Sequence, residues 1–162
     1  MIDAPDQTGI DDLPADVLDL LQRGMAQYRS DPAAAEFLFG IARSMAPASL
    51  PLYRVLIKFY NRACQFDAAY DMAVLGMGEA ARLGRLPPDW REWTPEMLSG
   101  REASFALLTL KAMAFLELRR GNTPASLAIL EQLRLLDPGD GIGSSVVAAL
   151  AAGIQTTDGV MP

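Results

Sequence analysis

Apolar residues along most of the chain recur every three or four positions, the spacing that places them on one side of an α-helix. Between residues 49 and 63 they are Leu52, Leu56, Phe59, Tyr60 and Ala63, and residues 107–118 follow the same rule. No stretch alternates convincingly with a period of two, as a half-buried strand would. The pattern predicts an all-α protein of about seven helices, at residues 14–29, 32–45, 50–63, 67–83, 103–120, 124–136 and 144–154.

Three helix starts are marked by the same pair of residues, a capping side chain followed by proline. Proline at the first helical position loses no hydrogen bond, and the preceding Asp or Thr oxygen accepts from a free backbone N–H. The pairs are Asp31-Pro32, Thr94-Pro95 and Thr123-Pro124. We therefore expect short links and antiparallel neighbouring helices, except at an insertion loop over residues 84–101 that has one helical turn after Thr94.

The chain has the length of one domain, and its composition supports one core. Hydrophobic residues make up 51% of the 162 residues and charged residues 21%, as in ordinary globular proteins. We expect a single domain at residues 13–155, with a flexible acidic N-terminus at 1–12 and a flexible C-terminus at 156–162.

Two segments align with each other as helix pairs, and a third copy is weaker. The first contains Tyr53, Leu56, Ile57, Tyr60, Cys64, Phe66, Ala69, Ala73 and Gly76. The second contains Leu110, Met113, Ala114, Glu117, Gly121, Thr123, Ser126, Leu130 and Leu133 at the same offsets, and the partial copy contains Asp31, Ala35, Phe39, Ala42 and Pro47. In these positions the chain resembles tetratricopeptide repeat (TPR) proteins, departing from their pattern mainly at Cys64 and Glu117. The resemblance implies a helical-hairpin solenoid with a concave groove.

Charge and side-chain chemistry exclude several classes of function. The net charge is −6, which is unfavourable for phosphate neutralisation, so neither nucleic acid nor a membrane surface is an expected partner. The chain has no histidine and one cysteine, which excludes a disulfide framework, a Cys/His zinc site and a histidine-dependent triad. The N-terminus lacks the features of a secretory signal, and we expect a cytoplasmic protein without metal or cofactor.

Three motifs suggest chemistry but have simpler interpretations. The sequence from Gly76 to Ala81 matches the dinucleotide pattern G-x-G-x-x-A, yet no strand is predicted before it, so packing glycines are favoured. Asp89, Glu92 and Glu96 beside two tryptophans resemble a glycosidase carboxylate pair, but an ordered loop explains them as well. Cys64 near a helix end is interpreted as a small buried side chain rather than a reactive thiol. We therefore expect no enzyme.

The first helix of each TPR hairpin lines the groove, and here those positions concentrate positive charge. The predicted groove residues are Arg54, Lys58, Asn61, Arg62, Lys111, Phe115 and Arg119. They include both lysines of an acidic protein, and cationic side chains in a groove favour carboxylates or an acidic extended segment. A solvated charged face is the alternative.

A second predicted interface combines the tryptophan loop with the last helix. Its residues are Trp90, Trp93, Val147, Leu150 and Ile154, and the helix at 144–154 has small, uncharged residues on its other faces. It is expected to pack on the last repeat or on a second subunit, which makes a homodimer one hypothesis. The sequence thus predicts a small TPR-like adaptor or chaperone that holds a segment of a partner protein. The alternatives are an assembly subunit docked through its last helix and, less favoured, a carboxylate-based enzyme.

Overall fold

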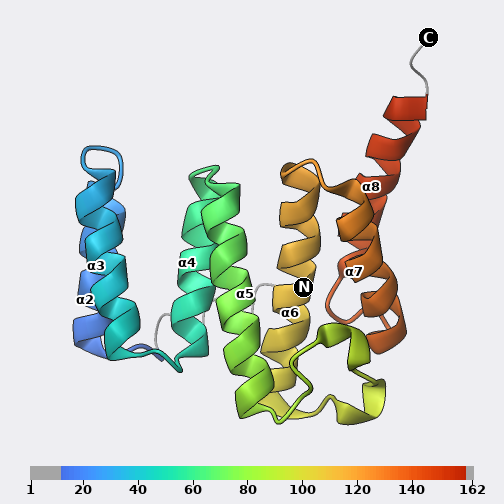
Figure 1. The fold of residues 1–162 in the computed structure, drawn as a ribbon, viewed down its shortest axis with the longest axis horizontal. Helices are drawn as coiled ribbons and strands as arrows, with labels where there is room; N and C mark the ends of the chain where they lie inside the picture. The colour runs from blue at the N-terminus through green and yellow to red at the C-terminus, as the bar shows by residue number, and fades with distance from the viewer. Residues whose placement is uncertain (1–11, 160–162) are drawn as a thin grey trace.

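The computed structural model describes residues 12–159, and this part of the chain is built from α-helices and two short 3₁₀ turns (Figure 1). The helices are α2 (Ala15–Gln27), α3 (Pro32–Met45), α4 (Leu50–Arg62), α5 (Phe66–Leu83), α6 (Gly100–Arg119), α7 (Thr123–Leu136) and α8 (Ser144–Gly159). The 3₁₀ turns are η1 (Trp90–Glu92) and η2 (Pro95–Met97), both between α5 and α6. The all-α prediction is confirmed.

The helices form a row in sequence order, as Figure 1 shows. Close backbone contacts join neighbours except α3 and α4, which meet through side chains such as Phe39 and Phe59. Their connections alternate between the upper and lower ends of the helices in this view, so neighbours are antiparallel while α4, α6 and α8 run in the same direction. Additional contacts join α4 to α6 and α6 to α8. These three parallel helices therefore follow one another along one row, which is the arrangement that positions the candidate site.

Most helix boundaries agree with the sequence pattern, and two ends differ. Helix α3 covers Pro32–Met45 as predicted, whereas α6 begins at Gly100 and α8 continues to Gly159. Gly100 adopts a φ of 83°, a left-handed conformation that favours glycine, so the insertion loop ends directly in the helix. The ends expected to be flexible include residues 1–11 and 160–162, which lie outside the described residues.

Of the three predicted helix starts with a capping residue before proline, one has the predicted capping hydrogen bond. Asp31 accepts a hydrogen bond from the N–H of Ala34 at 3.1 Å, as predicted for an N-cap. Thr94 precedes only the turn η2, and Thr123 is wrong as a cap because it is the first residue of α7, after Asn122. The start of α4 has a cap that the prediction missed, since Ser49 accepts from the N–H of Leu52 at 3.3 Å.

The two best repeats end their first helices with the same hydrogen bonds. In α4 the N–H of Gln65 donates to the carbonyl of Tyr60, and in α6 the N–H of Asn122 donates to Glu117, both at 2.8 Å. The residue before each donor is left-handed, with φ of 57° at Cys64 and 83° at Gly121. Both helix ends therefore use a capping hydrogen bond that reaches back five residues. The residue before the donor must be left-handed, which is why glycine is common at this position of a helix end.

The aligned apolar positions form the core. Buried members of the first repeat are Tyr53, Leu56, Ile57, Tyr60, Ala69, Ala73 and Gly76. Their counterparts Leu110, Met113, Ala114, Glu117, Ser126, Leu130 and Leu133 are buried too. The polar members have partners: Tyr60 donates to Glu36 at 2.6 Å, and Glu117 accepts from Arg120 at 2.8 Å. The repeat thus describes the packing of α4–α5 and α6–α7.

The insertion loop is fixed to α7 by hydrogen bonds from a side chain of that helix to the loop backbone. Gln132 donates from its amide nitrogen to the carbonyls of Trp90 and Trp93, at 3.3 and 3.1 Å. The indole N–H of Trp93 donates to the carbonyl of Pro87 at 2.7 Å, and its ring is 3% exposed. A buried indole with a satisfied N–H stabilises the loop.

Candidate binding groove

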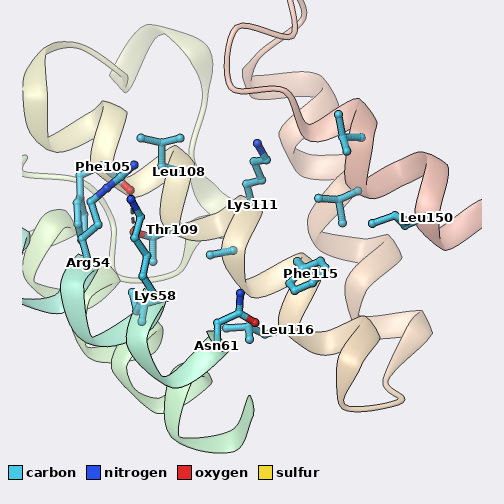
Figure 2. A pocket seen from close by; sticks show the side chains of 14 residues that line it. Arg54, Lys58, Asn61, Phe105, Leu108, Thr109, Lys111, Phe115, Leu116 and Leu150 are labelled. Carbon is cyan, nitrogen blue, oxygen red and sulfur yellow. Dashed lines mark hydrogen bonds between the residues drawn. The ribbon is translucent and has the colours of Figure 1, made fainter. Parts of the chain in front are cut away.

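A hollow of about 440 Å³ lies among α4, α6 and α8 (Figure 2). Fourteen side chains line it: Arg54, Ile57, Lys58 and Asn61 from α4, Phe105, Leu108, Thr109, Lys111, Ala112, Phe115 and Leu116 from α6, and Val146, Val147 and Leu150 from α8. The three helices contribute different chemistry. The α4 side is mainly polar and cationic, the α8 side is apolar, and α6 contributes both kinds of side chain to the floor. We call this hollow the groove.

Five of the seven residues predicted for a binding groove line this hollow. They are Arg54, Lys58, Asn61, Lys111 and Phe115. Arg62 is exposed at the end of α4 and does not line it. Arg119 is also absent from the lining, because its guanidinium stacks on the ring of Phe66 at 4.8 Å. Both arginines lie in the last turns of their helices, past the groove.

The cations on α4 are held in a partly desolvated environment. Burial, reinforced by the positive charges of Arg54 and Arg62, lowers the pKa of the Lys58 amine to about 8 from its ordinary value of 10.5. Burial also lowers the pKa of the Arg54 guanidinium, although an arginine stays charged at any physiological pH. A negative group that enters the groove would relieve the repulsion among these cations.

Lys111 extends from the floor toward the loop between α7 and α8. Its ammonium donates to the carbonyl of Ile142 at 3.0 Å. The same loop is ordered by Asp137, which accepts from the N–H groups of Gly141 and Ile142 at 3.1 and 2.9 Å. An ammonium has three donors, so the contact with Ile142 fixes its position without using its full hydrogen-bonding capacity.

The apolar wall supplied by α8 was predicted as a separate interface. Val147 and Leu150 were assigned to a secondary surface, yet both line the groove together with Val146. Figure 2 shows Leu150 pointing from α8 toward Phe115 on α6. The sequence showed that this helix has apolar residues for an interface, but the pattern alone could not show which helix they would face.

The other members of the predicted secondary interface lie elsewhere. Trp93 is wrong as a docking residue because its ring is buried and hydrogen-bonded within the insertion loop. Trp90 is half-buried, with the guanidinium of Arg91 over its ring at 4.4 Å. Ile154 is 38% exposed on α8 and is not part of the groove lining. The predicted interface is therefore divided between two regions.

No protein-family model, curated protein or solved structure matches this chain.

Neither a membrane span nor a metal cluster is found in the part of the chain that the structure describes. None of the helices within residues 12–159 combines the length and apolar character needed to cross a bilayer. Over the same residues, no three Cys, Asp or Glu side chains gather in a group that could hold a metal ion.

The motifs with alternative chemical interpretations occupy ordinary structural positions. Gly76 and Gly78 lie inside helix α5, not at the strand-to-helix turn that a dinucleotide site requires. Gly76 is a packing glycine as predicted, whereas Gly78 is not, since an added Cβ there would meet nothing within 4 Å. The prediction of a buried Cys64 is wrong: its side chain is exposed at a left-handed turn.

The carboxylates considered for catalysis lie along the insertion loop. Asp89 caps the turn η1 by accepting from the N–H of Arg91 at 3.0 Å. Glu92 and Glu96 are exposed, and hydrogen bonding to the Glu96 backbone N–H and to Thr94 lowers the pKa of the Glu96 carboxyl. None of the three lines the groove. Their arrangement provides no shared site with the cationic side chains.

Proposed function

We propose that this protein is a TPR-like adaptor or chaperone of the cytoplasm that holds an acidic segment of a partner protein in the groove. One observation supports this most directly. Two stretches of chain separated by more than forty residues, on α4 and α6, bring both lysines of an acidic protein to the same hollow. Partly desolvated cations beside apolar side chains favour a ligand with both carboxylates and apolar groups.

Partner capture with matched charge variants tests the proposal. The tagged protein is compared with an Arg54→Glu, Lys58→Glu, Lys111→Glu variant and with a control in which Arg23, Arg82 and Arg134 become Glu. The control has the same charge change at exposed side chains that pair with a neighbour on their own helix. We expect the groove variant to recover at least tenfold less partner, and the control to recover the wild-type amount.

Circular dichroism on all three proteins verifies that each is folded. Equal recovery of the partner by the groove variant and the wild type would remove the groove from the proposed function.

The low pKa of Lys58 gives the binding a pH dependence. The amine is charged below a pKa of about 8 and neutral above it, whereas the Arg54 guanidinium remains charged at any physiological pH. Retention of an acidic partner should therefore fall about fivefold between pH 7 and 9.5, the effect of losing one partly buried ion pair. The Lys58→Arg variant should retain the partner equally at both pH values. The same fall in that variant would assign the titration to another group.

The second candidate function is an assembly subunit that docks through α8. The observation in its favour is a stripe of apolar side chains on this helix, with Val146, Leu150 and Ile154 exposed by 61%, 48% and 38%. An obligate interface would make the isolated protein associate with itself or aggregate. Sedimentation of the purified protein that gives only monomer would argue against this candidate.

A further inference from the structure

The two walls of the groove repeat with the same spacing. Arg54 and Lys58 are four residues apart on α4, and Val146 and Leu150 are four residues apart on α8. At a rise of 1.5 Å per residue, four residues span about 6 Å along a helix. Each wall therefore presents two side chains of the same kind about 6 Å apart. They are cationic on the α4 wall and apolar on the α8 wall.

An extended peptide has a matching repeat. Alternate side chains of a β-strand point to opposite sides, and residues two apart on the same side are separated by about 6.6 Å. A segment that runs along α6 would direct every second side chain toward α4 and the intervening ones toward α8. The difference between about 6 and 6.6 Å is small over the two positions that each wall offers.

The length of the groove sets how much of an extended ligand it holds. Phe105 and Phe115 mark its length along α6, about 15 Å at the rise of an α-helix.

We propose that the groove selects an extended segment in which carboxylates at alternate positions face Arg54 and Lys58 and the intervening apolar side chains face Val146 and Leu150. This inference rests on the proposed function and specifies its ligand. Thr109, between the walls, uses its hydroxyl to donate to the Phe105 carbonyl at 2.7 Å, so it adds no competing donor to the floor. About four residues of the ligand fill the groove at 3.3 Å each.

Two peptides of identical composition test the alternation. The first is an eight-residue, fluorescein-labelled Glu-Val repeat, and the second has the same residues in the order Glu-Glu-Val-Val repeated twice. In the second peptide, carboxylates and valines alternate along each side. Because the composition is the same, its net charge and hydrophobicity are unchanged. Fluorescence anisotropy at pH 7 should give about tenfold tighter binding of the alternating peptide, since the other order loses an ion pair at the α4 wall and an apolar contact at the α8 wall.

Variants of each wall connect the preference to the geometry. Lys58→Glu and Leu150→Glu should each abolish the preference for the alternating peptide. Their controls are Arg23→Glu on α2 and Leu135→Glu on α7, whose side chains are exposed and outside the groove. Both controls should bind like the wild type.

The possible results separate this inference from the proposed function. Equal binding of both peptides, lost in Lys58→Glu, would overturn the alternation and keep an acidic-segment groove. Binding of neither peptide would overturn both. A dimer that dissociates in Leu150→Glu but not in Leu135→Glu would assign the groove to a second copy of the chain and overturn the inference.

Discussion

Replacing Phe39 by alanine should lower the free energy of unfolding by about 3–5 kcal/mol, the range found when a fully buried aromatic side chain is truncated. Phe39 is 1% exposed and lies against Gly24, where an added Cβ would approach its ring to 2.5 Å. Its ring also meets those of Phe59 and Tyr60 edge-on, with centroids 5.4 and 5.9 Å apart. The side chain therefore joins α2, α3 and α4, and its loss leaves a cavity among all three.

Phe37 provides the matched control on the same helix. Its side chain is 70% exposed, so Phe37→Ala makes the same chemical change without a cavity and should alter stability by less than about 0.5 kcal/mol. Urea unfolding followed by circular dichroism measures both variants. Similar losses for Phe37→Ala and Phe39→Ala would contradict the packing of α3 onto α2 and α4.

The helical pattern predicted which residues form the core because burial in this fold is local. Helices α4 and α6 each bury the side that their three- and four-residue spacing defines, and the links between neighbours are short except at the insertion loop. Phe39 and Leu130, which stand at aligned positions of the repeat, are both buried. Where a residue's environment depends on its own helix and the next one, the apolar periodicity is sufficient to predict its burial.

The errors arise where the backbone conformation overrides residue type. Cys64 was expected inside because cysteine is usually buried, but it occupies the left-handed position that ends α4. At the corresponding position α6 has Gly121, whose φ of 83° shows the same requirement. The alignment of the two repeats contained this information, since Cys64 aligned with a glycine. The alignment of Cys64 with Gly121 was therefore a better guide than the average behaviour of cysteine.

The groove was predicted in part because its third wall is a tertiary feature. The cationic residues of α4 and α6 follow from the repeat, which places them on equivalent faces of parallel helices. The position of α8 depends on the loop between Asp137 and Gly143, where Asp137 holds two backbone N–H groups and Lys111 binds Ile142. Such contacts leave no periodic pattern in the sequence. The sequence therefore showed that α8 has an apolar side but not where the helix lies in the fold.

Gly76→Leu should lower the free energy of unfolding by about 3 kcal/mol, as expected when a side chain is forced into a closely packed helix interface. An added Cβ would lie 2.9 Å from the Cβ of Tyr53 and 3.4 Å from the ring of Phe105. Tyr53 cannot easily move away, because its hydroxyl donates to the carbonyl of Pro47 at 2.9 Å. The larger residue therefore pushes α5 away from α4 and displaces Phe105 on the groove floor.

Gly78→Leu is the control for Gly76→Leu within α5. Gly78 has no atom within 4 Å of an added Cβ, so the substitution replaces a poor helix former by a good one and should stabilise the protein by about 0.7 kcal/mol. Urea unfolding gives both values, and the alternating peptide should bind more weakly to Gly76→Leu alone. Because both glycines belong to the G-x-G-x-x-A sequence, a dinucleotide site would need both. Opposite effects on stability would assign Gly76 to helix packing, whereas equal losses would contradict this structural role.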